Sequence, residues 1–243
     1  MTENTKIVFV VSIGLIVSSL ILGIFFYQAQ KEVNTIKVVG LASRAFVADR
    51  VKWNITIEEE ISEDNLKKGY LQLKDSTDKL KAELKAIDIK QEDINIKPVN
   101  VYKEYDYINE KGRSSKVFRG YRLQQHFYVI SDKVEEIEEL NFDPIKLLDK
   151  GVIIENSNLQ YFYSKIDQLK KDIISEAMVN AKERANKILE NTDLSLGKTV
   201  SIKSGVFQIT EPYSTNVSSG GVYNTSTKHK EIRVTVHAVF EID

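Results

Sequence analysis

The sequence predicts an α+β fold, with antiparallel or mixed sheets and helices packed on one face of them. Three observations support this prediction. Residues 46–59 and 228–242 alternate apolar and polar side chains, which is the period of a strand with one buried face. Two long segments, about 62–86 and 165–190, repeat apolar residues every three or four positions, as helices do. The stretch between these helices is rich in aromatic and β-branched residues, which favour strands.

The first sheet elements are predicted to be a short strand, 36–40, that ends at Gly40, and a longer strand, 46–59. Trp53, the only tryptophan, lies on the apolar face of the longer strand, so we expect it in a core. Ser62 is predicted to cap the helix that follows. The apolar positions of that helix form a narrow stripe, which favours a helix lying on a sheet over a short coiled coil.

A long hairpin is predicted after this helix, with strands at 94–107 and 116–130 joined by a polar loop at 106–115. The apolar residues of the first strand change from even to odd positions around Pro98, which predicts a bulge or an edge position there. Short helices and a further strand region at 152–163 follow. The order strand, helix, strand, strand, helix, strand is that of a ferredoxin-like split βαβ unit.

The C-terminal part is predicted to consist of a helix and two strands. Ala177, Ala181 and Ala185 recur at four-residue intervals on the inner face of the helix, so the helix can approach its sheet closely. Ser164 and Asp167 have the spacing of a capping box at the start of this helix. Its inner face is expected to end with Ile188, and the two strands are expected at 198–209 and 228–242.

Residues 7–27 carry no charged side chain and, as a helix, are long enough to cross a hydrocarbon core of about 30 Å. We expect a transmembrane anchor rather than a cleaved signal peptide, because no small-residue cleavage site follows this segment. The expected organisation is a tail at 1–6, the anchor at 7–27, a tether at 28–34 and an extracytoplasmic domain at 35–243. Two subdomains, with about 61–150 inserted in the rest, are an alternative division of that domain.

Composition and motifs argue against several classes of function. The formal net charge of −1 provides no basic face for a nucleic acid. The absence of cysteine excludes disulfides, thiol nucleophiles and cysteine-ligated metals. His229 and His237 lie about 26 Å apart along one strand, too far to share an ion, and His126 lies on another strand. No known catalytic or phosphate-binding motif is present, so we expect no enzymatic activity, no catalytic residues, no cofactor and no metal site.

Two stretches are candidates for interactions. Residues 211–227 (EPYSTNVSSGGVYNTST) form a connection between strands that is long for a compact domain, and their composition fits either disorder or partner binding. The aromatic hairpin is the second candidate, because aromatic side chains at a surface can mark a protein interface. The candidate contact residues are Tyr213, Val217, Val222 and Tyr223 in the loop, and Tyr105, Tyr107, Phe118 and Tyr121 in the hairpin.

Three stretches carry a resemblance to a known family: IKVVGLASRAFVADRVKWNITIEEE, AMVNAKERANKILENTDLSLGKTVSIKSG and IRVTVHAVFEI. Through them the chain resembles the SIMPL-domain family, of the periplasmic 26 kDa antigen type, over most of residues 36–242. Family members commonly have a Pro-Asp pair where this chain has Ala48 and Asp49. The resemblance implies an α+β domain exported to the bacterial envelope, a tendency to form large oligomers and a loose link to envelope or oxidative stress. It implies no catalytic residues.

The resulting hypothesis is a non-enzymatic envelope scaffold, anchored in the bacterial inner membrane through residues 7–27, with its domain facing the periplasm or the cell exterior. Its subunits would join through sheet edges, the aromatic hairpin and the loop 211–227. The alternative is a module that binds a ligand or peptide beneath the same loop. The expected partners are the membrane and further copies of the chain. An envelope protein or a small molecule is a further partner of unknown identity, and no nucleic acid is expected.

Overall fold

The structure is a computed structural model that describes residues 3–29, 34–62, 65–110 and 113–243. The chain divides into two compact units. Unit 1 comprises residues 1–41, 177–205 and 235–243, and unit 2 comprises residues 42–176 and 206–234. The division falls inside three elements, β1 (Thr35–Val47), α5 (Ile166–Leu189) and β10 (His229–Ile242).

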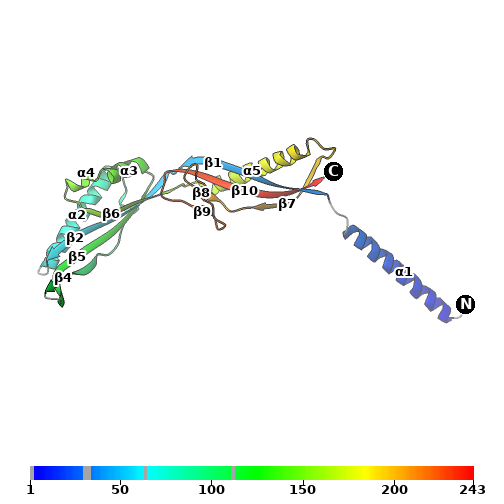
Figure 1. The fold of residues 1–243 in the computed structure, drawn as a ribbon, viewed down its shortest axis with the longest axis horizontal. Helices are drawn as coiled ribbons and strands as arrows, with labels where there is room; N and C mark the ends of the chain where they lie inside the picture. The colour runs from blue at the N-terminus through cyan, green and yellow to red at the C-terminus, as the bar shows by residue number, and fades with distance from the viewer. Residues whose placement is uncertain (1–2, 30–33, 63–64, 111–112) are drawn as a thin grey trace. The chain divides into compact units, whose positions relative to one another are not determined.

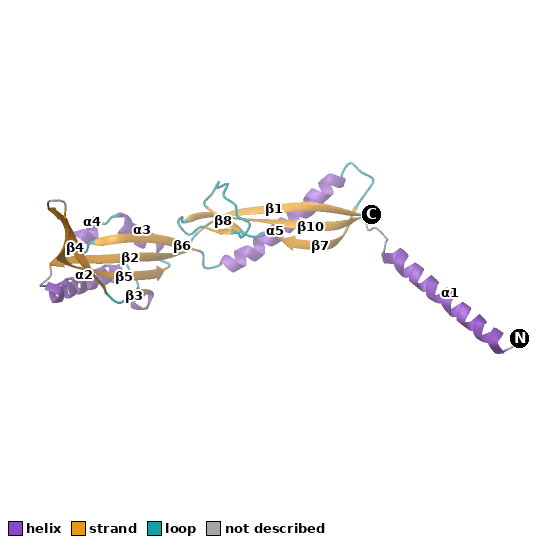
Figure 2. Ribbon diagram, turned by 60° about the horizontal axis from the view of Figure 1, so that its bottom comes forward, coloured by secondary structure: helices purple, strands orange, loops and turns teal. Residues whose placement is uncertain are grey.

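Unit 2 is built on an antiparallel sheet whose one face is covered by helices. Its strands are β2 (Arg50–Ser62), β3 (Ile94–Ile96), β4 (Asn100–Glu110), β5 (Arg113–Ser131) and β6 (Ile154–Phe162). Its helices are α2 (Leu66–Ala86), the 3₁₀ turn η2 (Gln91–Asp93), α3 (Val134–Phe142) and α4 (Ile145–Leu148). The strand order is β3-β5-β2-β6, and β4 also pairs with β5 (Figure 1 and Figure 2). This order matches the predicted split βαβ unit, with β3 and β4 sharing one strand position.

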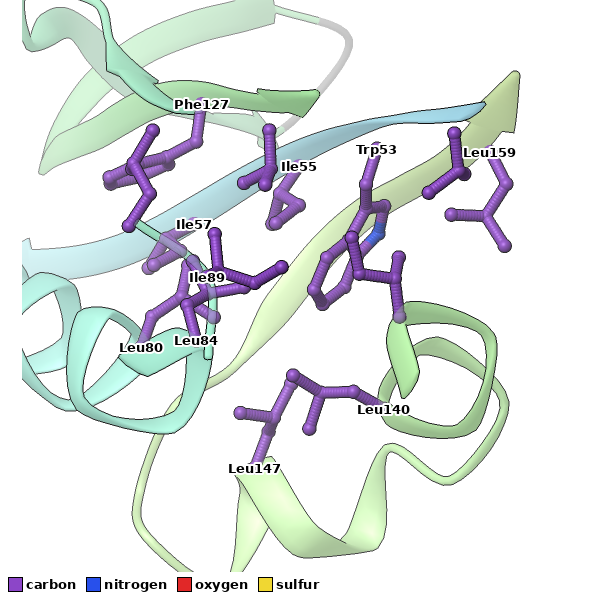
Figure 3. Packing of buried hydrophobic residues seen from close by; sticks show 14 of the residues in the cluster. Trp53, Ile55, Ile57, Leu80, Leu84, Ile89, Phe127, Leu140, Leu147 and Leu159 are labelled. Carbon is purple, nitrogen blue, oxygen red and sulfur yellow. The ribbon is translucent and has the colours of Figure 1, made fainter. Parts of the chain in front are cut away.

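The core of unit 2 lies between this sheet and the helices. Trp53 is fully buried at its centre, as predicted, and Ile55 and Ile57 of the same strand lie beside it. Figure 3 shows Leu80 and Leu84 approaching these strand residues from α2. Because these positions recur every three or four residues on α2, the helix buries one stripe against the sheet, and the preferred prediction is confirmed.

Unit 1 has a smaller core in which alanines predominate at the contact between helix and strands. Parts of β1 and β10 lie against the second half of α5, and the strand β7 (Leu196–Ser204) pairs with β10 (Figure 2). The core cluster here consists of Val38, Ala181, Ala185, Ala238 and Phe240. The second sheet has the order β1-β10-β8-β9, with β7 also pairing with β10; β8 (Gln208–Thr210) and β9 (Val222–Tyr223) belong to unit 2.

Gly40 explains how α5 comes so close to β1. A Cβ atom built at Gly40 would lie 2.0 Å from the carbonyl oxygen of Ala177 and 2.7 Å from the Cβ of Ala181. Only glycine fits between these groups without displacing backbone. The prediction that Gly40 ends a strand is therefore wrong: β1 continues to Val47, and this glycine serves close packing instead of a turn.

The N-terminal segment is helical, as α1 (Glu3–Ala29). Within the described residues, none of the helices combines the length and the apolar character needed to cross a membrane, so the anchor expected at 7–27 is not confirmed as a span. Most of the tether expected at 28–34 lies outside the described residues.

Other boundaries differ from the predictions for identifiable reasons. Ser62 is the last residue of β2 rather than a helix cap, and α2 begins at Leu66 after Asn65. β4 continues to Glu110 and β5 begins at Arg113, so most of the polar loop predicted at 106–115 belongs to strands. Gly112 lies outside the described residues. Pro98 does lie at a break in an edge, between β3 and β4.

Two predictions about α5 are also wrong. The hydroxyl and backbone amide of Ser164 both bond the carboxylate of Asp49, so Ser164 ties α5 to the turn before β2. Ile188 is 58% exposed, and Leu189 takes the buried position at the end of the helix. The alanine face, however, is confirmed, since Ala177, Ala181 and Ala185 are fully buried.

Candidate functional site

The β4–β5 hairpin brings together three of the four aromatic residues predicted there, Tyr105, Phe118 and Tyr121. The rings of Tyr105 and Phe118 have centroids 5.6 Å apart, and those of Phe118 and Tyr121 are 5.1 Å apart, both edge to face. The Nζ atom of Lys116 lies 3.8 Å from the centroid of the Tyr105 ring, a cation–π contact. Tyr107, two residues along β4, is 68% exposed. The hairpin therefore presents a row of rings that is packed at one end and open at the other.

β4 is also an edge strand whose outer side is free. It pairs only with β5, and no other backbone hydrogen bond of β4 is present among the described residues. β2 accompanies β5 only as far as Gly120, so the ends of β4 and β5 beyond this point form a two-stranded ribbon. The exposed apolar side chains on this ribbon and edge are Val101, Tyr102, Tyr107, Ile108 and Val117.

The edge of β1 is, in contrast, covered at Val39 and Leu41 by side chains of α5. The Oδ1 atom of Asn180 accepts a hydrogen bond from the backbone amide of Leu41 at 3.0 Å. The guanidinium of Arg184 donates to the carbonyl oxygen of Val39 at 2.9 Å. Because Asn180 and Arg184 are four residues apart, they lie on one face of the helix and satisfy two backbone groups of the same strand.

The edge of β6 is closed by the long loop 211–227. The backbone amide of Tyr161 donates to the carbonyl oxygen of Thr225 at 2.7 Å. The ring of Phe162 stacks on that of Tyr223 at 6.4 Å between centroids. The sequence interpretation missed this covering role, because nothing in the composition of the loop shows which strand it will lie against.

The loop is held by its own hydrogen bonds as well. The Asn224 amide donates to the Glu211 carboxylate at 2.6 Å, and Gln208 makes two bonds, of 2.8 and 3.2 Å, with the backbone of Ser218. Bonds from its backbone and from Ser214 and Asn224 lower the pKa of Glu211. Val222 and Tyr223 form β9, which pairs parallel with β8. These contacts hold the loop in a defined conformation. Binding of a partner by the loop stays a prediction.

The tip of the loop exposes two of the predicted contact residues. Tyr213 is 96% exposed and has a positive φ of 62°, a left-handed conformation that is unfavourable for a bulky residue. Its backbone amide donates a hydrogen bond to the carboxylate of Glu231, which holds the backbone in place at this residue. Val217 is 65% exposed. Tyr213 and Val217 thus belong to the loop surface, whereas Tyr105, Tyr107, Phe118 and Tyr121 form a separate surface on the hairpin.

The helix-free face of the unit 2 sheet carries a group of polar side chains. The Gln124 amide lies 2.6 Å from the Glu58 carboxylate and 3.0 Å from that of Glu155. Loss of solvent and the nearby charge of Glu58 raise the pKa of Glu155. The Nδ1 atom of His126 lies 2.8 Å from the Thr56 hydroxyl oxygen, so this ring is engaged by a neutral group.

The three histidines do not come together with carboxylates in a metal-binding group. His229 and His237 are both exposed, on the outward parity of β10 as predicted. Across the described ranges of the chain, no cluster of three or more histidine or acidic side chains is suitable for holding a metal ion.

Lys230 is a buried charge that the sequence interpretation missed. It is 1% exposed, and its ammonium group donates to the carbonyl oxygen of Asn224. Burial lowers its pKa to about 8, although the charge of Glu211 acts in the opposite direction. The sequence did contain a signal for this burial. Lys230 lies two and four residues before the buried Ile232 and Val234, so its side chain points to the same face of the strand.

A groove of about 450 Å³ lies between α2 and the edge formed by β3 and the residues after it. Its apolar wall includes Tyr70 and Leu71 of α2, which are 44% and 60% exposed, and Ile96 and Val99 opposite them. Lys67, Lys74 and Lys81 also line it. The seven-residue spacing of these lysines beside the apolar stripe of α2 was visible in the sequence. The groove itself was not predictable, because its other wall depends on where β3 lies.

The chain matches the model of a known protein family over residues 36–240. That family is SIMPL, described as a protein of unknown function (DUF541). No curated protein shows a detectable match to the chain. The matched region contains both units apart from α1 and the chain ends. It includes the first two stretches that carried the resemblance and all but the last two residues of the third. The chain therefore belongs to the SIMPL family.

Proposed function

We propose that this protein is a self-assembling scaffold whose copies join through the free edge of β4 and the aromatic face of the β4–β5 hairpin. The observation that carries the proposal is the contrast between edges of one chain. The β1 edge is bonded at Val39 and Leu41 by Arg184 and Asn180, and the β6 edge at Tyr161 by Thr225, whereas no bond to the outer edge of β4 is present among the described residues. An open edge with apolar side chains is a template for another strand.

Charge argues against two β4 strands pairing with each other in the registers centred on residues 104–106. In a two-fold symmetric antiparallel pair, a strand residue faces its own copy at the centre, and residues equally distant from it face each other. A register centred on Glu104 or Asp106 places like charges directly opposite, and one centred on Tyr105 places Glu104 opposite Asp106. Like charges directly opposite each other destabilise a sheet.

β7 of a second copy is the better partner for β4. Like β1 and β6, it has a single strand partner, but all its residues from Lys198 to Ser204 are exposed. Its only charged residues are Lys198 and Lys203, and its exposed Val200 and Ile202 offer apolar contacts. Joining two different strands makes a head-to-tail contact, which produces rings or filaments. This fits the large oligomers that the family resemblance implies.

The proposal retains an envelope location with a membrane anchor. Its support is in the sequence, where residues 7–27 contain no charged side chain and lie within the helix Glu3–Ala29. Extraction of membranes with alkaline carbonate tests the anchor: retention of the full chain in the pellet agrees with it, and complete release contradicts it. Protease protection of the domain in spheroplasts would contradict an extracytoplasmic location.

The experiment for assembly is the mass of the full chain by light scattering coupled to size exclusion, in a mild detergent and at micromolar concentration. The unaltered chain should elute as a defined oligomer. Tyr107→Lys with Ile108→Lys should shift it to the monomer, because two charges then face the incoming strand. Lys198→Glu with Lys203→Glu should do the same from the β7 side.

Two control variants separate edge pairing from general surface charge. Ile188→Lys replaces an apolar residue of comparable exposure on α5, and Lys171→Glu with Lys182→Glu reverses two exposed lysines away from β7. Both controls should leave the oligomer intact. A monomeric unaltered chain, or an oligomer insensitive to both edge variants, would overturn the proposal.

A further inference from the structure

The groove beside α2 has a feature that a simple apolar depression lacks, namely an edge of free backbone. The amide of Lys97 donates to the carbonyl oxygen of His126 at 2.9 Å, so Lys97 directs its backbone groups toward β5. Backbone direction alternates along a strand, and Ile96 therefore directs its own amide and carbonyl away from β5. Among the described residues, these two groups have no hydrogen-bond partner.

The side chain of Ile96 also lines the groove, together with Val99. An extended segment that bonded the backbone of Ile96 would run along the edge, with alternate side chains on the side of α2. Pro98 has no amide hydrogen, so the edge offers only a short run of donors beyond Ile96. A short segment with an apolar anchor suits this edge better than a long strand.

The opposite wall supplies positive charge. Lys67, Lys74 and Lys81 lie along α2 at intervals of two helical turns, about 10 Å each. Lys81 has Asp78 at 3.7 Å, whereas Lys67 and Lys74 have no ion pair within the described part of the chain. Asp78 is the one acidic residue in the lining of the groove. The balance of charge therefore favours an anionic occupant.

We propose that this groove binds a short, extended, acidic peptide segment by strand addition to the edge at Ile96. Apolar side chains of the segment contact Tyr70, Leu71 and Val99, and its carboxylates meet Lys67 and Lys74. Backbone pairing favours a peptide over a fatty acid or another small amphiphile, because only a peptide can satisfy both free groups of Ile96. This inference does not rest on the proposed self-assembly, which uses β4 and β7.

The test is fluorescence polarisation of the full chain with a labelled synthetic peptide, Glu-Thr-Val-Thr-Glu-Thr-Leu, whose acidic and apolar side chains all lie on one face of an extended strand. We expect saturable binding that weakens as ionic strength rises. A peptide of the same pattern with lysine in place of glutamate should not bind. A third peptide, methylated on the amides that would face Ile96, should bind about tenfold more weakly or worse, because it cannot form the backbone bonds.

Variants of the groove use exposed positions, so the fold should be retained, which circular dichroism checks. Lys74→Glu and Leu71→Asp should each weaken the acidic peptide by about tenfold or more. Lys68→Glu is the matched control, since Lys68 is an exposed lysine of the same helix outside the groove, and it should leave binding unchanged. The oligomer mass, measured in parallel, should not change in these variants.

Several results would overturn the inference. An absence of saturable binding of the acidic peptide would refute the inference. Equal binding of the methylated peptide would replace strand addition with a pocket for amphiphilic anions. An equal loss in Lys68→Glu and Lys74→Glu would show attraction to the whole helix surface instead of a site. Loss of self-assembly with intact peptide binding would instead refute only the proposed function.

Discussion

The two units of this protein reach a packed core by opposite means. Unit 2 fills the space between sheet and helices with Trp53 and branched aliphatic side chains, whereas unit 1 removes side-chain volume so that α5 lies almost on the strands. In the first case stability depends on volume that is present, and in the second on volume that is absent. Removal of side-chain volume should therefore be most damaging in unit 2, and addition of volume should be most damaging in unit 1.

The largest effect is expected for deletion of volume in unit 2. Trp53→Ala should lower the free energy of unfolding by about 3–5 kcal/mol, because it leaves a cavity and frees the Ser157 hydroxyl that now accepts the indole N–H at 2.6 Å. Urea denaturation followed by circular dichroism measures the loss. Trp53→Phe keeps most of the volume and should cost clearly less. Equal losses in the two variants would mean that the hydrogen bond, not the packing, dominates.

Addition of volume in unit 1 is the complementary change. Gly40→Ala should destabilise the protein by about 3 kcal/mol, the upper end for overpacking, because the new methyl group meets the backbone of α5 at Ala177. The matched control is Gly220→Ala, where a Cβ has only the Ser218 hydroxyl at 4.0 Å. Thermal melting of both variants tests this. Equal melting temperatures would show that α5 moves away from β1 at little cost.

The third prediction concerns the charge that unit 2 buries on β10. Since burial lowers the pKa of Lys230 to about 8 from its usual value near 10.5, the unfolded chain binds the proton more tightly than the folded one. Stability should therefore rise with pH above about 8, by about 2 kcal/mol up to pH 9.5. Below pH 8 both states hold the proton, and this contribution is constant.

Lys230→Met should abolish that rise, whereas Lys203→Met, at an exposed position, should preserve it. The measurement is the free energy of unfolding at several values between pH 7.5 and about 9.5. Higher pH is avoided because Tyr161 and Tyr223 have raised pKa values, caused chiefly by burial, and their titration lowers stability above pH 10. A flat profile for the unaltered chain would contradict the lowered pKa of Lys230.

The smallest loss of stability is expected for the polar side chains of α5 that bond the backbone of β1. Arg184→Ala removes the hydrogen bond to the carbonyl oxygen of Val39 and should cost about 1 kcal/mol. Lys182→Ala removes an exposed side chain two residues earlier and should be neutral. Hydrogen exchange at β1 gives a local readout: faster exchange of the Leu41 amide in Asn180→Ala, but not in Lys182→Ala, would confirm that α5 protects this edge.

The sequence was most informative where one pattern determined one structure. The alternation around Trp53 and along β10, and the alanines of α5, led to correct burial because period and side-chain size act locally. Gly40 was misinterpreted because glycine serves both turns and close packing, and only the position of α5 distinguishes the two. Ser164 was misinterpreted for the same reason, since its partner Asp49 is distant in the sequence.

The candidate sites were predictable only in part. The aromatic residues of the hairpin were identified from composition, and Tyr105, Phe118 and Tyr121 do meet. The free edge of β4, the covered edge of β6 and the groove at Ile96 depend on which strands become neighbours. Neighbour relations come from long-range pairing, which no short stretch of sequence encodes.

The single indole at Trp53 also makes the molecule optically asymmetric. Excitation at the red edge of the aromatic band selects this one chromophore, which is fully buried in unit 2, while unit 1 contains no tryptophan. The emission will thus shift when the core of unit 2 opens, and it will stay unchanged when only unit 1 melts. Comparing emission with far-ultraviolet ellipticity on one sample would show whether the two units lose their structure together or in sequence.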